Sequence, residues 1–377
     1  MIARSLEQNL IPWLGRGKAL VLIGPRQVGK TTLTRKLAQD MGQATLWLTG
    51  DDPATRELMA DISLARLQQV VGTHQVVVID EAQRLTNAGL TLKLLTDHFP
   101  GVQLLVTGSS SLDLAAQTKE SLVGRKIEYL LLPMSFAEMS AHLGYAHERS
   151  LLEHRMVYGY YPEVVQHEAA QAQRILGDLA DGLMYKDLLA LDQLKKPSLL
   201  VNLLQALALQ VSREVSYREL GQLIGADPAT VERYIDLLEQ TFVVFRLRSL
   251  SRNLRNEIKK GRKIYFYDNG IRNAVLKNFA PLNLRDDTGA LWENFLIAER
   301  HKRNTYAEHF CNRYFWRTQA QQEIDYVEER NGQLTAFEFK WSARRKVRFS
   351  KTFLQAYPQS KTETITPQNF EAFVGLP

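Results

Sequence analysis

Cysteine is nearly absent, since Cys311 is the only one in 377 residues. A single thiol excludes an internal disulfide framework and a thiolate metal site built by one chain. No apolar run approaches the roughly 18–20 residues that span a bilayer, so no membrane partner is expected. The opening residues, MIARSLEQNLIPWL, mix apolar with polar positions and indicate a helix rather than a secretory segment. The expected compartment is therefore cytoplasmic.

Basic charge is concentrated in two stretches of the chain. The net charge is +6, whereas residues 246–263 alone carry +7 and residues 340–351 carry +6. The rest of the chain is therefore acidic. Local basic runs are typical of polyanion binding, which favours DNA contacted through its backbone without sequence preference. A solvated basic face is the alternative for either run alone.

Residues 1–130 are predicted to form an α/β domain with a parallel sheet. Short apolar runs alternate with a helical pattern over residues 31–41, and they lie at 18–23, 44–48, 76–80 and 103–108. Strands that are apolar on both faces and separated by helices indicate a parallel sheet covered on both sides. This is the architecture of an α/β doubly wound domain.

The later chain is predicted to contain three further parts. Residues 131–210 are helical in pattern and read as a lid or linker. Residues 211–265 give helix, turn, helix and strand, with Asp227 as a helix cap before Pro228, which is the order of a winged helix-turn-helix. Residues 266–377 mix strands with a helix and are expected to be α+β, with a hairpin turn at Asn331-Gly332.

A phosphate-binding loop is predicted at residues 24–31. GPRQVGKT fits the pattern G-x-x-x-x-G-K-[ST] and lies between a predicted strand and a predicted helix. The expected cofactors are ATP and Mg²⁺, with Lys30 on the β- and γ-phosphates and the Thr31 hydroxyl on the metal. The expected nucleotide-binding residues are Gly24, Pro25, Arg26, Gln27, Val28, Gly29, Lys30, Thr31, Thr32 and Asp80.

Positions after the loop are expected to serve hydrolysis. Asp80 ends an apolar strand and would orient the magnesium, and Glu81 would act as the general base toward water. A third apolar strand ends in Ser109-Ser110, where a contact to the γ-phosphate is expected and turn formation is the alternative. Arg125 is a candidate for stabilising the transition state in a neighbouring subunit, with a local salt bridge as the alternative.

The chain resembles a family of prokaryotic AAA-type ATPases whose C-terminal part is a domain of unknown function. The resemblance rests on GPRQVGKTTL, VVVIDEAQR, LLVTGSSS, LVGRKIEYLLLPMSFAE, YGYYPEVV, DNGIRNAV, GALWENFLIAE and YFWRT…EIDYVEE…AFEFKW. It implies that the nucleotide is bound by the loop at residues 24–31, by the strand end at Asp80-Glu81 and by Ser109. It also puts Gly124-Arg125 at the position from which an arginine acts on the nucleotide of a neighbouring subunit. Tyr160-Tyr161 departs from the family pattern, which leaves the purpose of that loop open. No second sensor arginine is evident, and Arg155 and Arg174 are unranked candidates.

The C-terminal part contains an ordered set of acidic residues and a lysine. Glu293 falls on a predicted helix, Asp325 on a strand, and Glu338-Phe-Lys340 on the strand after the turn. This order resembles that of the PD-(D/E)xK nuclease core. Asp325 and Glu338 are candidate ligands of a second metal, with Glu293 and Lys340 nearby. The alternatives are a nuclease-like domain that only binds, or an unrelated α+β domain whose charged residues lie on a half-exposed strand.

Two classes of function follow from these patterns. The favoured one is a homo-oligomeric ATPase that remodels DNA, including branched DNA, or moves along it. The expected recognition helix carries Glu232, Asp236 and Glu239 against only Arg233, so phosphate contact after that helix is favoured over base readout. The alternative is a nucleotide-controlled switch in regulation or defence that acts through protein partners. A nuclease licensed by ATP is compatible with either.

Overall fold

The computed structural model describes residues 2–60, 63–109, 122–182, 197–250, 261–318, 320–342 and 348–376. The chain forms two compact units. The first comprises Met1–Pro133 with Gln240–Phe242, and the second comprises Met134–Glu239 with Val243–Pro377. The expected boundary near residue 130 lies close to the end of the first unit.

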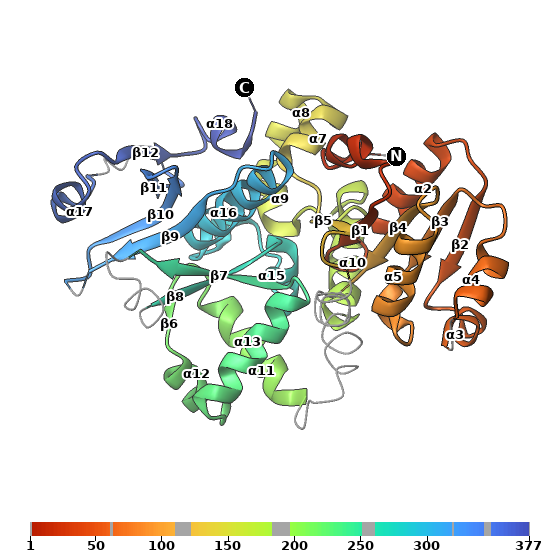
Figure 1. Ribbon diagram of the computed structural model, residues 1–377. Helices are drawn as coiled ribbons and strands as arrows, with labels where there is room; N and C mark the ends of the chain where they lie inside the picture. The colour runs from red at the N-terminus through yellow and green to blue at the C-terminus, as the bar shows by residue number, and fades with distance from the viewer. Residues whose placement is uncertain are drawn as a thin grey trace. The chain divides into compact units, whose positions relative to one another are not determined.

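The first unit contains a five-stranded sheet in the order β2-β3-β4-β1-β5, in which every pair of neighbours is parallel. β1, β3 and β4 are buried at every position, as expected for strands covered on both faces. The α/β prediction is confirmed (Figure 1). The elements are α1 (Glu7–Leu10), η1 (Ile11–Trp13), β1 (Ala19–Ile23), α2 (Lys30–Asp40), β2 (Thr45–Thr49), α3 (Pro53–Ala60), α4 (Leu64–Val71), β3 (Val76–Asp80), η2 (Ala82–Arg84), α5 (Ala88–His98), β4 (Gln103–Gly108) and β5 (Lys126–Leu130).

The strand order of this sheet determines which loops meet. β4 lies between β1 and β3, although it follows both of them in the chain. Because parallel strands end at the same edge, the loop after β1 and the residues after β3 lie on either side of the end of β4. This edge brings together the segments that the sequence predicts to bind nucleotide.

The second unit begins with helices and continues with a mixed sheet. Its helices are α7 (Phe136–Leu143), α8 (Tyr145–Ser150), α9 (Leu152–Tyr158), η3 (Val164–Gln166), α10 (Ala169–Gly182), α11 (Pro197–Leu209), α12 (Tyr217–Ile224), α13 (Pro228–Gln240), α15 (Asn269–Val275), η5 (Leu282–Leu284), α16 (Thr288–Tyr306), α17 (Lys351–Ala356) and α18 (Glu371–Val374). Its strands are β6 (Glu214–Val215), β7 (Val244–Ser249), β8 (Arg262–Phe266), β9 (Asn312–Arg317), β10 (Glu323–Arg330), β11 (Gln333–Phe339) and β12 (Lys361–Ile365).

The described residues of 197–250 and 261–266 follow the order helix, strand, helix, helix, strand, strand. β8 pairs antiparallel with both β6 and β7. The helix cap expected at Asp227 is confirmed, because its side chain accepts a hydrogen bond from the backbone N–H of Thr230. Ser216 accepts one from the backbone N–H of Glu219 in the same way. These interactions fix where α12 and α13 begin.

Seven strands form one sheet in the order β12-β11-β10-β9-β7-β8-β6. β7 pairs in parallel with β9, so the sheet is continuous across the expected boundary at residues 265–266. β10 and β11 form the hairpin predicted at Asn331-Gly332, whose φ angles of 50° and 77° suit a two-residue turn. β12 returns parallel to β11 after α17, as can be followed in Figure 1.

Helix α16 is fixed to this sheet by a buried amide. The Asn294 side chain accepts a hydrogen bond from the backbone N–H of Phe266 at 2.8 Å and donates to the carbonyl oxygen of Phe266 at 3.1 Å. Trp292 and Phe295 on the same helix are 0% and 3% exposed. The neighbouring residue Glu293 is thereby held beside β8.

Candidate functional site

The candidate nucleotide site begins where β1 ends. Gly24 and Gly29 have φ angles of 149° and 95°, which L-residues with a side chain rarely adopt. A Cβ at Gly24 would also collide with the carbonyl oxygen of Leu131. α2 starts at Lys30, directly after Gly29. The loop therefore precedes a helix N-terminus, where backbone N–H groups and the helix dipole favour a phosphate.

Lys30 lies inside this loop. Its side chain is 4% exposed, and Nζ donates hydrogen bonds to the carbonyl oxygens of Gly24 at 2.9 Å and Pro25 at 2.7 Å. The loop backbone thus holds the ammonium group of Lys30 close to the place where the same loop would bind phosphates, so its positive charge would stabilise them.

Arg4 is a contact of the loop that the sequence did not reveal. Its guanidinium is buried and donates to the carbonyl oxygens of Val28 at 2.7 Å and Leu132 at 2.6 Å. The N-terminal segment thus ties the phosphate-binding loop to the residues after β5. No motif marks this arginine, because its role comes from contacts 24 and 128 residues away.

Thr31 and Asp80 meet across the sheet edge. The Thr31 hydroxyl lies 3.1 Å and 3.0 Å from the two carboxylate oxygens of Asp80. The Thr107 hydroxyl on β4 also donates to Asp80. A hydroxyl and a carboxylate are the hard oxygen donors that Mg²⁺ prefers, so these residues fit the metal expected with ATP. Thr107 was not assigned from the sequence, where it is one residue of an apolar run.

Glu81 has a backbone conformation that is uncommon outside glycine. Its φ and ψ angles are 50° and 45°, and its backbone N–H donates to the Thr107 hydroxyl at 3.1 Å. Gln83 joins the Glu81 side chain to Ser109, because its Nε2 lies 2.6 Å from Oε2 of Glu81 and 2.8 Å from Oγ of Ser109. The structure thus brings together the expected base and the expected γ-phosphate contact. Gln83 was missed, and Ser110 lies outside the described residues.

Arg125 forms a local ion pair. It ends the turn before β5, and its Nε lies 2.5 Å from Oδ1 of Asp97 on α5. The hydrogen bond from Arg125 lowers the pKa of Asp97 from its ordinary value. The alternative of a local salt bridge is therefore present within one chain. A role toward a neighbouring subunit stays a prediction.

The second unit brings together the four C-terminal candidates. Glu293 lies on α16, Asp325 on β10, Glu338 on β11 and Lys340 directly after it. Nζ of Lys340 lies 2.8 Å from Glu338 and 3.6 Å from Asp325. Asp325 also accepts a hydrogen bond from the backbone N–H of Phe339 at 2.8 Å. One ammonium group therefore holds both predicted metal ligands.

Three residues that the sequence did not assign complete this cluster. Nζ of Lys263 on β8 lies 3.2 Å from Oε1 of Glu293 and also pairs with Glu323. The Tyr265 hydroxyl donates to the same Glu293 oxygen at 2.6 Å. β8 is distant in sequence from the motif, so only the pairing of the strands reveals these contacts. Within the described ranges, no group of three His, Cys, Asp or Glu residues is arranged to hold a metal.

Burial changes the ionisation of this acid-lysine cluster, defined as Lys263, Glu293, Glu323, Asp325, Glu338 and Lys340. Burial raises the pKa of Glu293 to about 7, and burial with the nearby charge of Asp325 raises the pKa of Glu338 to about 7. Burial alone would lower the pKa of Lys263. The negative charges of Glu293, Glu323 and Asp325 outweigh that effect, so the pKa of Lys263 is raised above its ordinary value. The cluster therefore combines charged lysines with carboxyl groups that exchange protons near neutrality.

Both basic runs extend beyond the described residues, since 251–260 and 343–347 lie outside them. Two described arginines of the first run, Arg246 and Arg262, pair with α13. Arg246 pairs with Asp236 and Glu239, and Arg262 lies 3.5 Å from Glu232. All three acids of the expected recognition helix are therefore compensated by arginines of β7 and β8.

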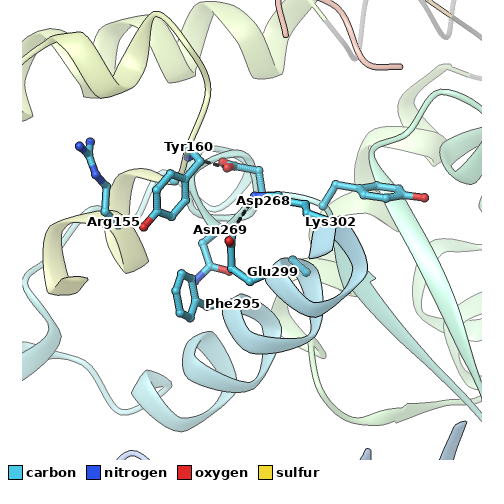
Figure 2. A pocket seen from close by; sticks show the side chains of 10 residues that line it. Arg155, Tyr160, Asp268, Asn269, Phe295, Glu299 and Lys302 are labelled. Carbon is cyan, nitrogen blue, oxygen red and sulfur yellow. Dashed lines mark hydrogen bonds and ion pairs between the residues drawn. The ribbon is translucent and has the colours of Figure 1, made fainter. Parts of the chain in front are cut away.

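A small pocket in the second unit lies among buried charges (Figure 2). Figure 2 shows the Asp268 carboxylate directed at the backbone of Tyr160, where it accepts a hydrogen bond from the N–H at 2.7 Å. Lys302 donates to the carbonyl oxygen of Met134 at 2.8 Å and pairs with Glu299. The space suits about one water molecule, so we interpret this pocket as structural.

The two arginines considered for a second sensor differ in their surroundings. Arg155 is 2% exposed and forms a two-point ion pair with Glu148, at 3.0 Å and 3.1 Å. That guanidinium is engaged within the second unit. Arg174 is exposed on α10.

In the part of the chain that the structure covers, no helix is both long and apolar enough to span a membrane.

Comparisons with known families match three successive segments. Residues 16–140 match an AAA domain, residues 149–282 match a domain of unknown function (DUF8612), and residues 288–370 match a second one (DUF4143). The uncharacterized protein Rv2008c of Mycobacterium tuberculosis is 26% identical over 340 residues, which cover 89% of this chain and 73% of that protein. The uncharacterized protein MJ1544 of Methanocaldococcus jannaschii is 23% identical over 330 residues, covering 80% and 70%.

Solved structures give weaker likenesses. A RuvB point mutant of Thermotoga maritima is 14% identical with a TM-score of 0.34, covering 74% of this chain and 96% of that one. The Pif1 helicase from Candida albicans is 12% identical with a TM-score of 0.27, covering 48% of each chain. TM-scores this low do not establish a common fold over the aligned lengths. The AAA-domain match, which spans the loop, Asp80 and Ser109, supports an AAA-type ATPase in the first unit.

Proposed function

We propose that the first unit hydrolyses ATP in the presence of Mg²⁺ and that the chain couples this turnover to DNA. The observation that carries the proposal is the meeting of Lys30, Thr31, Asp80 and Glu81 at the end of a parallel sheet, at a helix N-terminus. Anion-binding backbone, a lysine, two hard oxygen ligands and a carboxylate base are the parts that phosphoryl transfer to water requires.

Each residue has a defined task in this proposal. The loop and Lys30 bind the phosphates, while Thr31 and Asp80 would hold Mg²⁺, which neutralises phosphate charge when bound. Glu81 accepts a proton as the water oxygen bonds to the γ-phosphorus. The bond from that phosphorus to the β–γ bridging oxygen breaks, giving ADP and phosphate. Ser109 contacts the γ-phosphate, and Arg125 is proposed to act on the nucleotide of a neighbouring subunit in a homo-oligomer.

The DNA part of the proposal rests on the second unit. The described elements on either side of residues 251–260 occur in an order compatible with a winged helix-turn-helix, and the basic residues of that stretch lie between β7 and β8 in the sequence. The ion pairs of Arg246 and Arg262 compensate the acids of α13, which reduces the repulsion between that helix and a phosphate backbone. Contacts to phosphates without base readout are the expected mode.

DNA is expected to stimulate ATP hydrolysis, and its binding is expected to weaken steeply with salt. Binding through about six phosphates loses ~10³-fold in affinity between about 50 and about 200 mM salt, because condensed counterions are released. ATP turnover should be measured with no nucleic acid and with duplex, single-stranded and branched DNA, alongside binding at several salt concentrations.

The same measurement separates the competing function. If ATP changes the oligomeric state while no DNA alters turnover, the chain is a nucleotide-controlled switch that acts on protein partners. Stimulation by one DNA structure only would identify the preferred substrate. RNA serves as the comparison polyanion, because a purely electrostatic contact responds to both.

A second candidate function is metal-dependent cleavage of phosphodiester bonds in the second unit. The observation that favours it is the convergence of Glu293, Asp325, Glu338 and Lys340 from a helix and two strands. The order of α16, β9, β10, β11, α17 and β12 agrees with the nuclease-like core expected from the sequence. Asp325 and Glu338 would hold a divalent metal, and Lys340 would orient the attacked phosphate or the water.

Asp325→Ala is expected to lower the rate of any Mg²⁺- or Mn²⁺-dependent DNA cleavage by about 10²-fold or more, because it removes one of the two acidic metal ligands. Cleavage of duplex, single-stranded and branched DNA should be measured with the wild type, Asp325→Ala and the control Asp286→Ala, which lies outside the cluster. If the wild type cuts none of these substrates with either metal, the cluster is a binding or structural element.

A further inference from the structure

The residue that links Glu81 to Ser109 belongs to a short turn after β3. Gln83 lies in η2, two residues beyond Glu81. The backbone of Glu81 is fixed there, because its N–H donates to Thr107 and its carbonyl oxygen lies against Gly50, where a Cβ would collide with it. A left-handed conformation at a residue other than glycine costs of order 1 kcal/mol or more and persists only where the surroundings enforce it. The turn therefore returns Gln83 alongside the Glu81 carboxylate.

The orientation of the Gln83 amide follows from its neighbours. Its nitrogen lies 2.6 Å from a carboxylate oxygen of Glu81 and donates to it. If the amide were flipped, its oxygen would face that carboxylate oxygen, and two hydrogen-bond acceptors would lie side by side. The same nitrogen lies 2.8 Å from the Ser109 hydroxyl oxygen. The two amide protons are thus used on Glu81 and on Ser109. Ser109 accepts from Gln83, so its own proton points to a different acceptor.

The other end of this amide is buried and lacks a partner. Oε1 of Gln83 has no hydrogen-bond donor among the described residues. A buried acceptor without a donor costs roughly 1–3 kcal/mol, so the position is expected to be used. In ATP hydrolysis the donor beside a general base is the attacking water, and an amide oxygen that accepts its second proton orients that water.

We propose that Gln83 is a positioning residue of the ATPase, which holds the base Glu81 to the γ-phosphate contact Ser109 and directs the attacking water through Oε1. The inference rests on the proposed ATPase function. It assigns to Gln83 an effect on the chemical step and none on the binding of ATP, since the hydrogen bonds of the Gln83 side chain among the described residues go to Glu81 and Ser109.

Two variants separate this role from a structural one. Gln83→Glu keeps the shape but replaces the donor with a second carboxylate facing Glu81, and Gln83→Met keeps the length without either polar group. Both are expected to lower kcat by about 10- to 10²-fold, the effect of a misplaced catalytic group, while KM and the Kd for ATP change less than about threefold. Ser109→Ala combined with Gln83→Met should cost little more than the larger single effect, because the two residues act as one unit.

The experiment is steady-state ATP hydrolysis with ATP binding and thermal unfolding measured for each variant of the full chain. If both variants hydrolyse ATP as the wild type does, or if kcat and ATP affinity fall together with the melting temperature, the inference is overturned. If the wild type itself hydrolyses no ATP, the proposed function fails instead. Wild-type turnover that Glu81→Gln abolishes and both Gln83 variants reduce at unchanged ATP affinity supports the inference.

Discussion

Glu81→Gln is expected to retain ATP binding and to lower kcat by about 10²- to 10⁴-fold, the usual contribution of a general base. The amide keeps the size of the carboxylate and leaves Lys30, Thr31 and Asp80 in place. It removes the group that accepts the proton from water. The fall should therefore appear in kcat, with the Kd for ATP near that of the wild type.

The test is ATP turnover paired with equilibrium binding of ATP. Glu57→Gln, an exposed glutamate on α3, makes the same chemical change elsewhere in the unit and should leave both quantities unaltered. Normal turnover by Glu81→Gln would show that another group takes the proton. Loss of ATP binding would show that Glu81 serves the nucleotide pocket itself.

The sequence predicted the first unit well because its signals are local. Four of the five parallel strands, β1 to β4, coincide with the predicted apolar runs, whereas β5 carries Lys126 and Glu128 and was not predicted. The loop from Gly24 to Thr31 has a fixed spacing that follows from phosphate geometry. Thr107 and Gln83 escaped prediction for a physical reason. Their importance lies in hydrogen bonds 26 and 27 residues away, which depend on β4 lying beside β3.

The acid-lysine cluster likewise contains residues that the sequence predicted and residues that it did not. Glu293, Asp325, Glu338 and Lys340 were predicted, because a helix, a hairpin and a two-residue spacing place them on neighbouring faces. Lys263 was not predicted, since β8 lies about 30 residues before Glu293 in the sequence and is placed beside the cluster by the Asn294 amide and by strand pairing across the sheet. Contacts between distant strands leave no local pattern in a single sequence.

Buried ion pairs were the least predictable feature of the second unit. Arg155 was considered for a sensor role, yet it is engaged with Glu148, which is 0% exposed. The Tyr160 hydroxyl donates to the same carboxylate at 2.9 Å. Tyr160 is one of the two tyrosines at which the sequence departs from the pattern of the family that it resembles, and its hydroxyl takes part in this buried ion pair.

Arg155→Met is expected to destabilise the second unit by about 3–5 kcal/mol, because it leaves the Glu148 carboxylate buried without the guanidinium that neutralises it, while the hydrogen bond from the Tyr160 hydroxyl stays. Urea unfolding followed by hydrogen exchange of the α9 amides measures this locally. Arg248→Met, an exposed arginine on β7, should cost within about 0.5 kcal/mol. Adding Glu148→Gln to Arg155→Met should recover much of the loss, since removing both charges avoids the unpaired one. If Arg155→Met alone is neutral, the pair does not hold this unit together.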